Sequence, residues 1–87
     1  MNHFATPSFW FHYRQLDRDT RELADKSFQL LKADSTHRSL RFKKVGNFWT
    51  VRIGLRYRAL AKERSEGLAW FWIGPHDEYE NLLKQAY

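Results

Sequence analysis

The sequence predicts an α+β domain in which a helical hairpin packs on a four-stranded, largely antiparallel sheet, with a short C-terminal helix. Residues 7–33 carry apolar side chains three or four positions apart, which is typical of helices. Residues 40–73 instead alternate between apolar and polar side chains or form short apolar runs, which is typical of strands. No repeat or linker divides the 87 residues, so we expect a single domain over residues 1–87.

The helical hairpin comes first along the chain. A helix is predicted over residues 7–16, because Thr6 can cap its N-terminus and Pro7 needs no hydrogen-bond acceptor in the first turn. A second helix begins after Asp17 or Asp19 and ends near residues 32–33.

The strands follow, separated by turns that contain glycine. Gly46-Asn47 is the expected centre of a hairpin turn, and Trp49, Val51 and Ile53 point away from Arg52. Residues 68–73 include no polar side chain, which indicates a strand inside the sheet. We expect strands near residues 40–44, 49–53, 57–64 and 68–73, with a weaker indication at residues 2–5.

The last helix is expected after Gly74-Pro75, which end the preceding strand. Acidic residues in its first turn, Asp77 and Glu78, suit the helix dipole. Tyr79, Leu82 and Leu83 form its apolar stripe.

The net charge of +5 is unevenly distributed. Residues 38–64 contain nine basic residues and one acidic residue, which gives +8, and the rest of the chain carries −3. Such clustering is expected of a protein that binds a polyanion, although solvated strand faces would also explain it.

The composition excludes several classes of protein. With no cysteine the chain can hold neither a disulfide nor a thiolate-bound metal, and its four histidines lack metal-ligand spacing. The apolar runs are too short to cross a membrane, and the first residues have neither the basic nor the apolar segment of a signal peptide. We therefore expect a cytoplasmic protein without a metal or cofactor. Aromatic residues make up 17% of the chain and would supply a dense core, with all four tryptophans at core-like positions.

The basic residues and the start of the last helix suit phosphodiester chemistry. Cleavage of RNA by its own 2′-hydroxyl needs a base, cations near the phosphate and an acid for the leaving oxygen. Arg52, His76 and Tyr79 are the candidates for catalysis, and His76 and Tyr79 share one helix face. Each also has an ordinary structural explanation, such as a core position for Tyr79. The candidates for phosphate binding are Arg41, Lys43, Lys44, Arg56 and Arg58.

Three segments, Lys43–Gly54, Tyr57–Leu60 and Trp70–Tyr79, resemble the RelE/ParE superfamily of bacterial type II toxins. Residues 24–32 and 37–40 also fit, although Arg38 stands where many relatives have proline. The resemblance implies a cognate antitoxin as partner. RelE-like members are ribosome-dependent endonucleases that cut mRNA, whereas ParE-like members poison DNA gyrase and lack the catalytic set.

The resemblance also implies roles for individual residues. Arg52 would contact the scissile phosphate, His76 would act as general acid, and Tyr79 would position or activate the 2′-hydroxyl. Lys43 and Lys44 resemble residues that bind the RNA backbone, and Arg58 resembles a structural or phosphate-binding residue. We therefore expect an endoribonuclease acting on ribosome-bound mRNA; the alternatives are a gyrase inhibitor and an inactive toxin-like binding domain.

Overall fold

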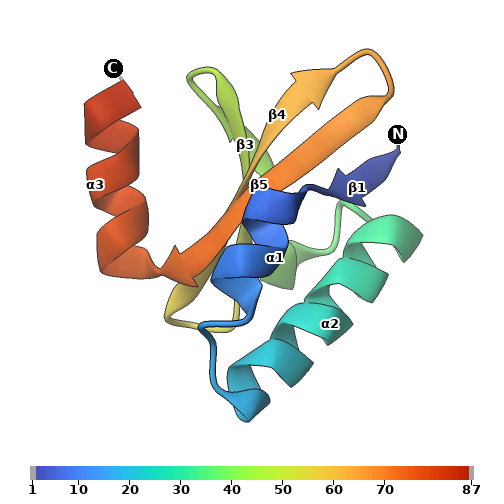
Figure 1. The fold of residues 1–87 in the computed structure, drawn as a ribbon. Coiled ribbons are helices and arrows are strands. Elements are labelled where there is room, and N and C mark those ends of the chain that lie inside the picture. Colours follow the sequence, from blue (N-terminus) through green and yellow to red (C-terminus); the bar gives the residue numbers. More distant parts are fainter. Residues whose placement is uncertain (1, 87) are drawn as a thin grey trace.

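The computed structural model describes residues 2–86, which form one five-stranded sheet with helices on both faces (Figure 1). The helices are α1 (Pro7–Tyr13), α2 (Arg18–Ala33), the short 3₁₀ helix η1 (Arg38–Leu40) and α3 (His76–Ala86). The strands are β1 (His3–Ala5), β2 (Lys43–Val45), β3 (Phe48–Ile53), β4 (Tyr57–Arg64) and β5 (Gly67–Pro75).

The strand order is β1-β5-β4-β3-β2, and β2 to β5 are antiparallel as predicted. The prediction of four strands is wrong, because β1 adds a fifth, parallel to residues 68–70 of β5. The weak indication of a strand at residues 2–5 is thereby confirmed. Three residues are too few to show a clear alternation, and the strand exists because β5, more than 60 residues away in the sequence, offers it an edge.

Residues 40–42 are not part of a strand, contrary to prediction. Leu40 ends η1, and Arg41 follows in the left-handed region with φ of 46°. Leu40 is only 1% exposed. The apparent alternation therefore reflects the burial of Leu40 at the end of a helical turn, and β2 begins at Lys43.

The other boundaries differ from the prediction by a few residues. Helix α1 ends at Tyr13 rather than residue 16, whereas α2 begins and ends as predicted, with Asp17 accepting a 2.8 Å hydrogen bond from the backbone N–H of Thr20. Strand β5 continues through Gly74 and Pro75 because both pair with β4.

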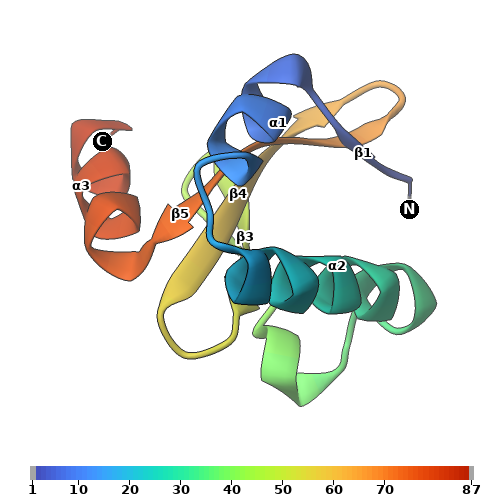
Figure 2. The ribbon, with the colours of Figure 1, turned by 60° about the horizontal axis from the view of Figure 1, so that its bottom comes forward.

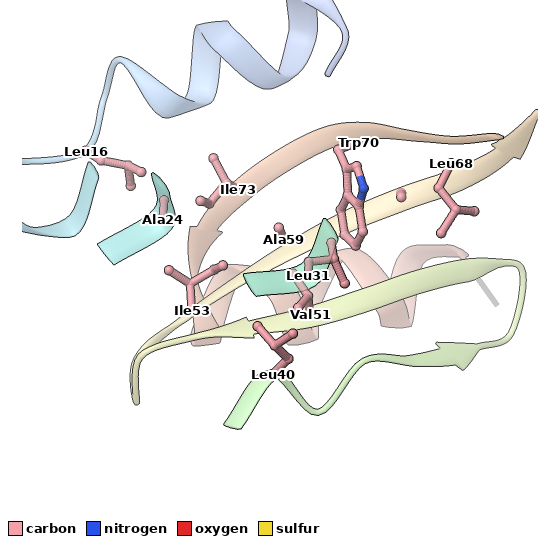
Figure 3. Close-up of a cluster of buried hydrophobic side chains, with 11 residues drawn as sticks. Leu16, Ala24, Leu31, Leu40, Val51, Ile53, Ala59, Leu68, Trp70 and Ile73 are labelled. Atoms are coloured by element: carbon pink, nitrogen blue, oxygen red, sulfur yellow. The ribbon is translucent and has the colours of Figure 1, made fainter. Parts of the chain in front are cut away.

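Two cores lie on opposite faces of the sheet. The larger core packs residues of α1 and α2, such as Leu31, against Val51 and Trp70 (Figure 3). The smaller core contains Leu60, Trp72 and Tyr79 and lies under α3. Figures 1 and 2 show α3 on the other side of the sheet from α1 and α2.

A bulge in β5 directs two consecutive side chains into the smaller core. Leu60 pairs with Trp72 and Ala61 pairs with Trp70, so Phe71 is an extra residue in β5. Phe71 and Trp72 consequently both pack in the core under α3, while Trp70 lies in the larger core. Trp10 is 43% exposed, so the prediction that all four tryptophans lie in the core is wrong.

Candidate functional site

Basic residues gather on the sheet face that α3 partly covers, which we call the α3 face. Side chains directly opposite one another on paired strands share a face. Arg52 lies opposite Arg58, and Arg58 lies opposite Gly74. One row further along the sheet, Lys43 lies opposite Thr50, which in turn lies opposite Leu60 of the core under α3. Lys43, Arg52 and Arg58 therefore share the α3 face.

The two arginines are held by backbone carbonyls at the β3–β4 turn. Arg52 Nε donates to the Gly54 carbonyl at 2.9 Å, and Arg58 Nη1 donates to the Tyr57 carbonyl at 2.8 Å. Burial lowers the pKa of Arg58, and the positive charges of Arg52 and Arg41 lower it further, while Tyr79 opposes the shift. The guanidiniums thus repel one another, and an anion bound between them would relieve that repulsion.

His76 and Tyr79 lie near Arg58 because α3 begins where β5 ends. The backbone N–H of His76 donates to the Arg56 carbonyl at 2.8 Å, which fixes the start of the helix against the β3–β4 turn. The His76 and Tyr79 ring centroids are 5.6 Å apart, and the guanidinium carbon of Arg58 is 6.0 Å from the Tyr79 ring centroid. The Tyr79 ring therefore lies between the His76 imidazole and the Arg58 guanidinium as a neighbour of both.

Tyr79 also has a structural role. It is 8% exposed and packs with Leu60 and Trp72, as the alternative of an ordinary core residue predicts. Removal of the whole side chain would disturb this core, so the role of the hydroxyl must be tested separately from the ring.

An open pocket of about 480 Å³ lies at this end of the sheet. We call it the arginine pocket; its lining residues are Leu55, Arg56, Tyr57, Arg58, Pro75, His76 and Asp77. Two cations and a histidine line a cavity large enough for a phosphodiester, so the pocket could hold a nucleotide and exchange protons with it.

Lys44 lies apart from the other candidates. It is opposite Trp49, on the face that carries α1 and α2, and its Nζ is 3.4 Å from Glu63 Oε1. Trp49 Nε1 donates to the same carboxylate oxygen at 2.8 Å, and this bond, together with Lys44, lowers the pKa of Glu63. The structure therefore separates the two lysines that the sequence left equivalent and places only Lys43 with Arg52.

Glu80 was not among the site residues predicted from the sequence. Its Oε1 is 3.4 Å from Nδ1 of His76, one helical turn earlier, and can orient the imidazole. The spacing of four residues on a predicted helix was the signal that could have identified it.

Within residues 2–86, no three His, Asp or Glu side chains are placed to hold a metal ion. No helix in the same range has the length and apolar character needed to cross a membrane.

The comparisons with known proteins agree on the fold. Residues 18–81 match the family described as the ParE-like toxin domain. A chain from the crystal structure of the RelB-RelE antitoxin-toxin complex from Methanococcus jannaschii is similar, with a TM-score of 0.68 and 11% identity over 91% of this chain and 96% of that one.

The isolated E. coli RelE toxin is also similar, with a TM-score of 0.60 and 12% identity over 98% of this chain and 97% of the other. A search of curated proteins gave no match.

Proposed function

The chain belongs to the ParE-like toxin domain family of the RelE/ParE superfamily, and from this premise we propose that it is the toxin of a type II toxin–antitoxin module and cleaves ribosome-bound mRNA. Two relatives of the same fold are described as a RelE toxin and a RelB-RelE antitoxin-toxin complex, which supports an antitoxin partner. The observation that carries the nuclease proposal is the convergence of His76, Tyr79 and Arg58.

In the proposed reaction the RNA 2′-hydroxyl attacks the adjacent phosphorus, and the bond to the 5′-oxygen of the next nucleotide breaks. Tyr79, as a phenolate, positions the 2′-hydroxyl and accepts its proton, and His76, as an imidazolium, donates a proton to the departing oxygen. The products are a 2′,3′-cyclic phosphate and a free 5′-hydroxyl, so the atoms and protons balance.

The cations act on the phosphate throughout this reaction. Arg52 and Arg58 are paired across adjacent strands and stabilise the charge that grows on the phosphoryl oxygens. Lys43 on the same face, and Arg41 and Arg56 at the nearby turns, hold the flanking backbone. These positive charges also suit an acidic antitoxin segment that would block the site.

The cleavage experiment uses cell-free translation, with primer extension to locate cuts in the message. The wild-type protein should cut mRNA only when ribosomes engage it. Tyr79→Phe keeps the buried ring and removes the hydroxyl, and His76→Gln keeps a polar side chain. Each should slow cleavage about 10²- to 10⁴-fold, as is typical for loss of a general acid or base. Arg52→Ala should also slow cleavage.

The matched control is His12→Gln. His12 lies on α1 and is absent from the residues that line the arginine pocket. Cleavage at the wild-type rate by the Tyr79→Phe and His76→Gln variants would refute the site assignment.

The alternative function is gyrase inhibition, with which the match to the ParE-like toxin domain is equally compatible. A DNA supercoiling assay distinguishes the two. Inhibition of gyrase while the message stays intact would replace the nuclease proposal. Failure in both assays, with no growth arrest on expression, would indicate an inactive toxin-like binding domain.

A further inference from the structure

A separate open pocket, of about 410 Å³, lies between β1, α1 and α2, on the side of the molecule away from α3 (Figure 1). We call it the aromatic pocket, because the rings that line it include those of Phe9, Trp10, Tyr13 and Phe28. Among the described residues, it shares no lining side chain with the arginine pocket. The aromatic pocket is therefore distinct from the proposed catalytic site.

We propose that the aromatic pocket binds a small organic cation and favours a quaternary ammonium ion. The volume of the pocket lies within the range of about 300–1,000 Å³ that is usual for small-molecule sites. Because this pocket is separate from the arginine pocket, the proposal does not depend on the nuclease function.

Two perpendicular rings of α1 form a corner in the pocket. The ring centroids of Trp10 and Tyr13 are 5.2 Å apart and their planes meet at 84°, while the plane of Trp10 meets that of Phe9 at 85°. Trp10 is 43% exposed, so its ring is open to a ligand. A cation is attracted to the face of an aromatic ring, and most strongly to that of tryptophan. Perpendicular rings can contact one such cation from two sides.

A carboxylate lies beside this corner. The Tyr13 hydroxyl donates a 2.8 Å hydrogen bond to Asp25 Oδ1, which ties Asp25 to the ring. Burial raises the pKa of Tyr13 and the bond to Asp25 raises it further, so the hydroxyl keeps its proton and the bond persists. Asp25 is the only acidic residue among the described residues that line the pocket, and no ion pair within residues 2–86 involves it. Its charge is therefore available to a bound cation.

One aromatic face of the pocket already has a cation on it. Lys32 Nζ lies 5.0 Å from the Phe28 ring centroid. Lys32 and Asp25 are seven residues apart on α2, or about 10 Å along the helix axis, so the lysine leaves the corner at Trp10 open. His3 also lines the pocket, but burial lowers its pKa, which favours the neutral ring.

The polar groups of the pocket favour a quaternary ammonium ion over a primary one. A primary ammonium ion brings three N–H donors that lose their water on binding. The acceptors on the side chains of α1 and α2 that line the pocket are few, namely Asp25, Gln29 and the Tyr13 hydroxyl, which already donates to Asp25. A quaternary ion has no N–H group, so it needs only the aromatic faces and the charge of Asp25.

The test measures binding of three probes by isothermal titration calorimetry and by the NMR shift of the Trp10 indole N–H. The probes are choline, ethanolamine, and a neutral alcohol in which a tert-butyl group replaces the trimethylammonium group of choline. Choline should bind saturably, and about fivefold or more tightly than either of the other two, as is typical for a cation–π contact with a tryptophan. The Trp10 signal should move with the same Kd.

Two substitutions separate the charge from the ring. Asp25→Asn removes the charge but keeps an oxygen that can accept from Tyr13, so it carries little folding risk. Trp10→Leu removes the aromatic face but keeps an apolar side chain. Each should weaken choline binding about fivefold.

The matched controls lie on the same two helices but outside the pocket. Asp19→Asn changes an acidic residue in the first turn of α2, and Phe11→Ala changes an aromatic residue of α1 that is 58% exposed. Both variants should bind choline with the wild-type Kd.

Several results would overturn the proposal. Absence of saturable choline binding in the millimolar range would show that the pocket holds no such cation. Equal affinities for choline and the neutral alcohol would show an ordinary apolar cleft, and equal affinities for choline and ethanolamine would refute the quaternary preference. Wild-type affinity in both Asp25→Asn and Trp10→Leu, or equal weakening in the control variants, would place the binding elsewhere.

Discussion

Gly74→Ala tests whether the Trp72 ring requires a glycine at position 74. Gly74 lies opposite Arg58, and an added Cβ would lie 2.5 Å from Cζ2 and 2.9 Å from Cη2 of Trp72. Trp72 is 6% exposed and packs with Leu60 and Tyr79, so its ring has little room to move. Overpacking of this kind costs about 1–3 kcal/mol of unfolding free energy. For a domain of this size the melting temperature should fall by about 5–20 °C.

The assay is urea and thermal denaturation of Gly74→Ala in two backgrounds. Trp72→Phe removes the two ring atoms that the new methyl group would meet, although it is itself destabilising. Alanine is otherwise preferred to glycine inside a strand by about 0.5–1 kcal/mol. In the Trp72→Phe background, Gly74→Ala should therefore be neutral or stabilising. An equal loss of stability in both backgrounds would refute the steric explanation.

Three further predictions concern the lysines, the N-terminal strand and the first helix cap. Lys43→Gln should slow RNA cleavage about tenfold, because a charge-assisted contact to phosphate is lost. Lys44→Gln should cleave within about twofold of the wild-type rate in the same primer-extension assay. Equal effects of the two substitutions would contradict the separation of the two lysines. His3 Nδ1 accepts a 3.0 Å hydrogen bond from Trp70 Nε1, and burial lowers the pKa of His3, so the folded state resists its protonation. The unfolding free energy should therefore be constant above pH ~6.5 and fall as the pH drops below it. Urea denaturation at about pH 7.5 and about pH 5 should show a smaller fall in unfolding free energy for His3→Gln than for the wild-type protein. An equal fall in both proteins would rule out His3 as the cause. Thr6 Oγ1 accepts a hydrogen bond from the Phe9 N–H at 3.3 Å and donates one to the Trp70 carbonyl at 3.2 Å. Thr6→Ala should therefore lower the unfolding free energy measured by denaturation by about 1–2 kcal/mol, and Thr6→Ser should lower it much less. Similar losses for both variants would show that the methyl group matters rather than the hydroxyl.

Local signals in the chain were enough to predict the α+β class and the order of most elements. Thr6-Pro7 and Asp17 mark helix starts through bonds made within one turn, and the structure has both helices there. The alternation around Arg52 was also reliable, because side-chain direction in a strand depends only on the backbone of that strand. For the same reason His76 and Tyr79 were expected on one face of the last helix, and their rings lie 5.6 Å apart.

Features that depend on distant partners could not be predicted in this way. The alternation near residues 40–42 resembled a strand, but Leu40 is buried from a 3₁₀ turn. Strand β1 forms only because β5 leaves an edge open to it. The bulge at Phe71 shifts the register of β5 against β4, which no periodicity within β5 reveals.

The amino-acid sequence by itself determined which residue types could do the chemistry, since charge and helix spacing are local properties of the chain. The tertiary structure decided which of them meet. Adjacent residues of a strand point to opposite faces, so the register of β2 on β3 directs Lys43 to the α3 face and Lys44 to Glu63. The pairing of β3 with β4 sets Arg52 beside Arg58, and the end of β5 brings Tyr79 to Arg58, because only the assembled sheet sets the distances between side chains on different strands.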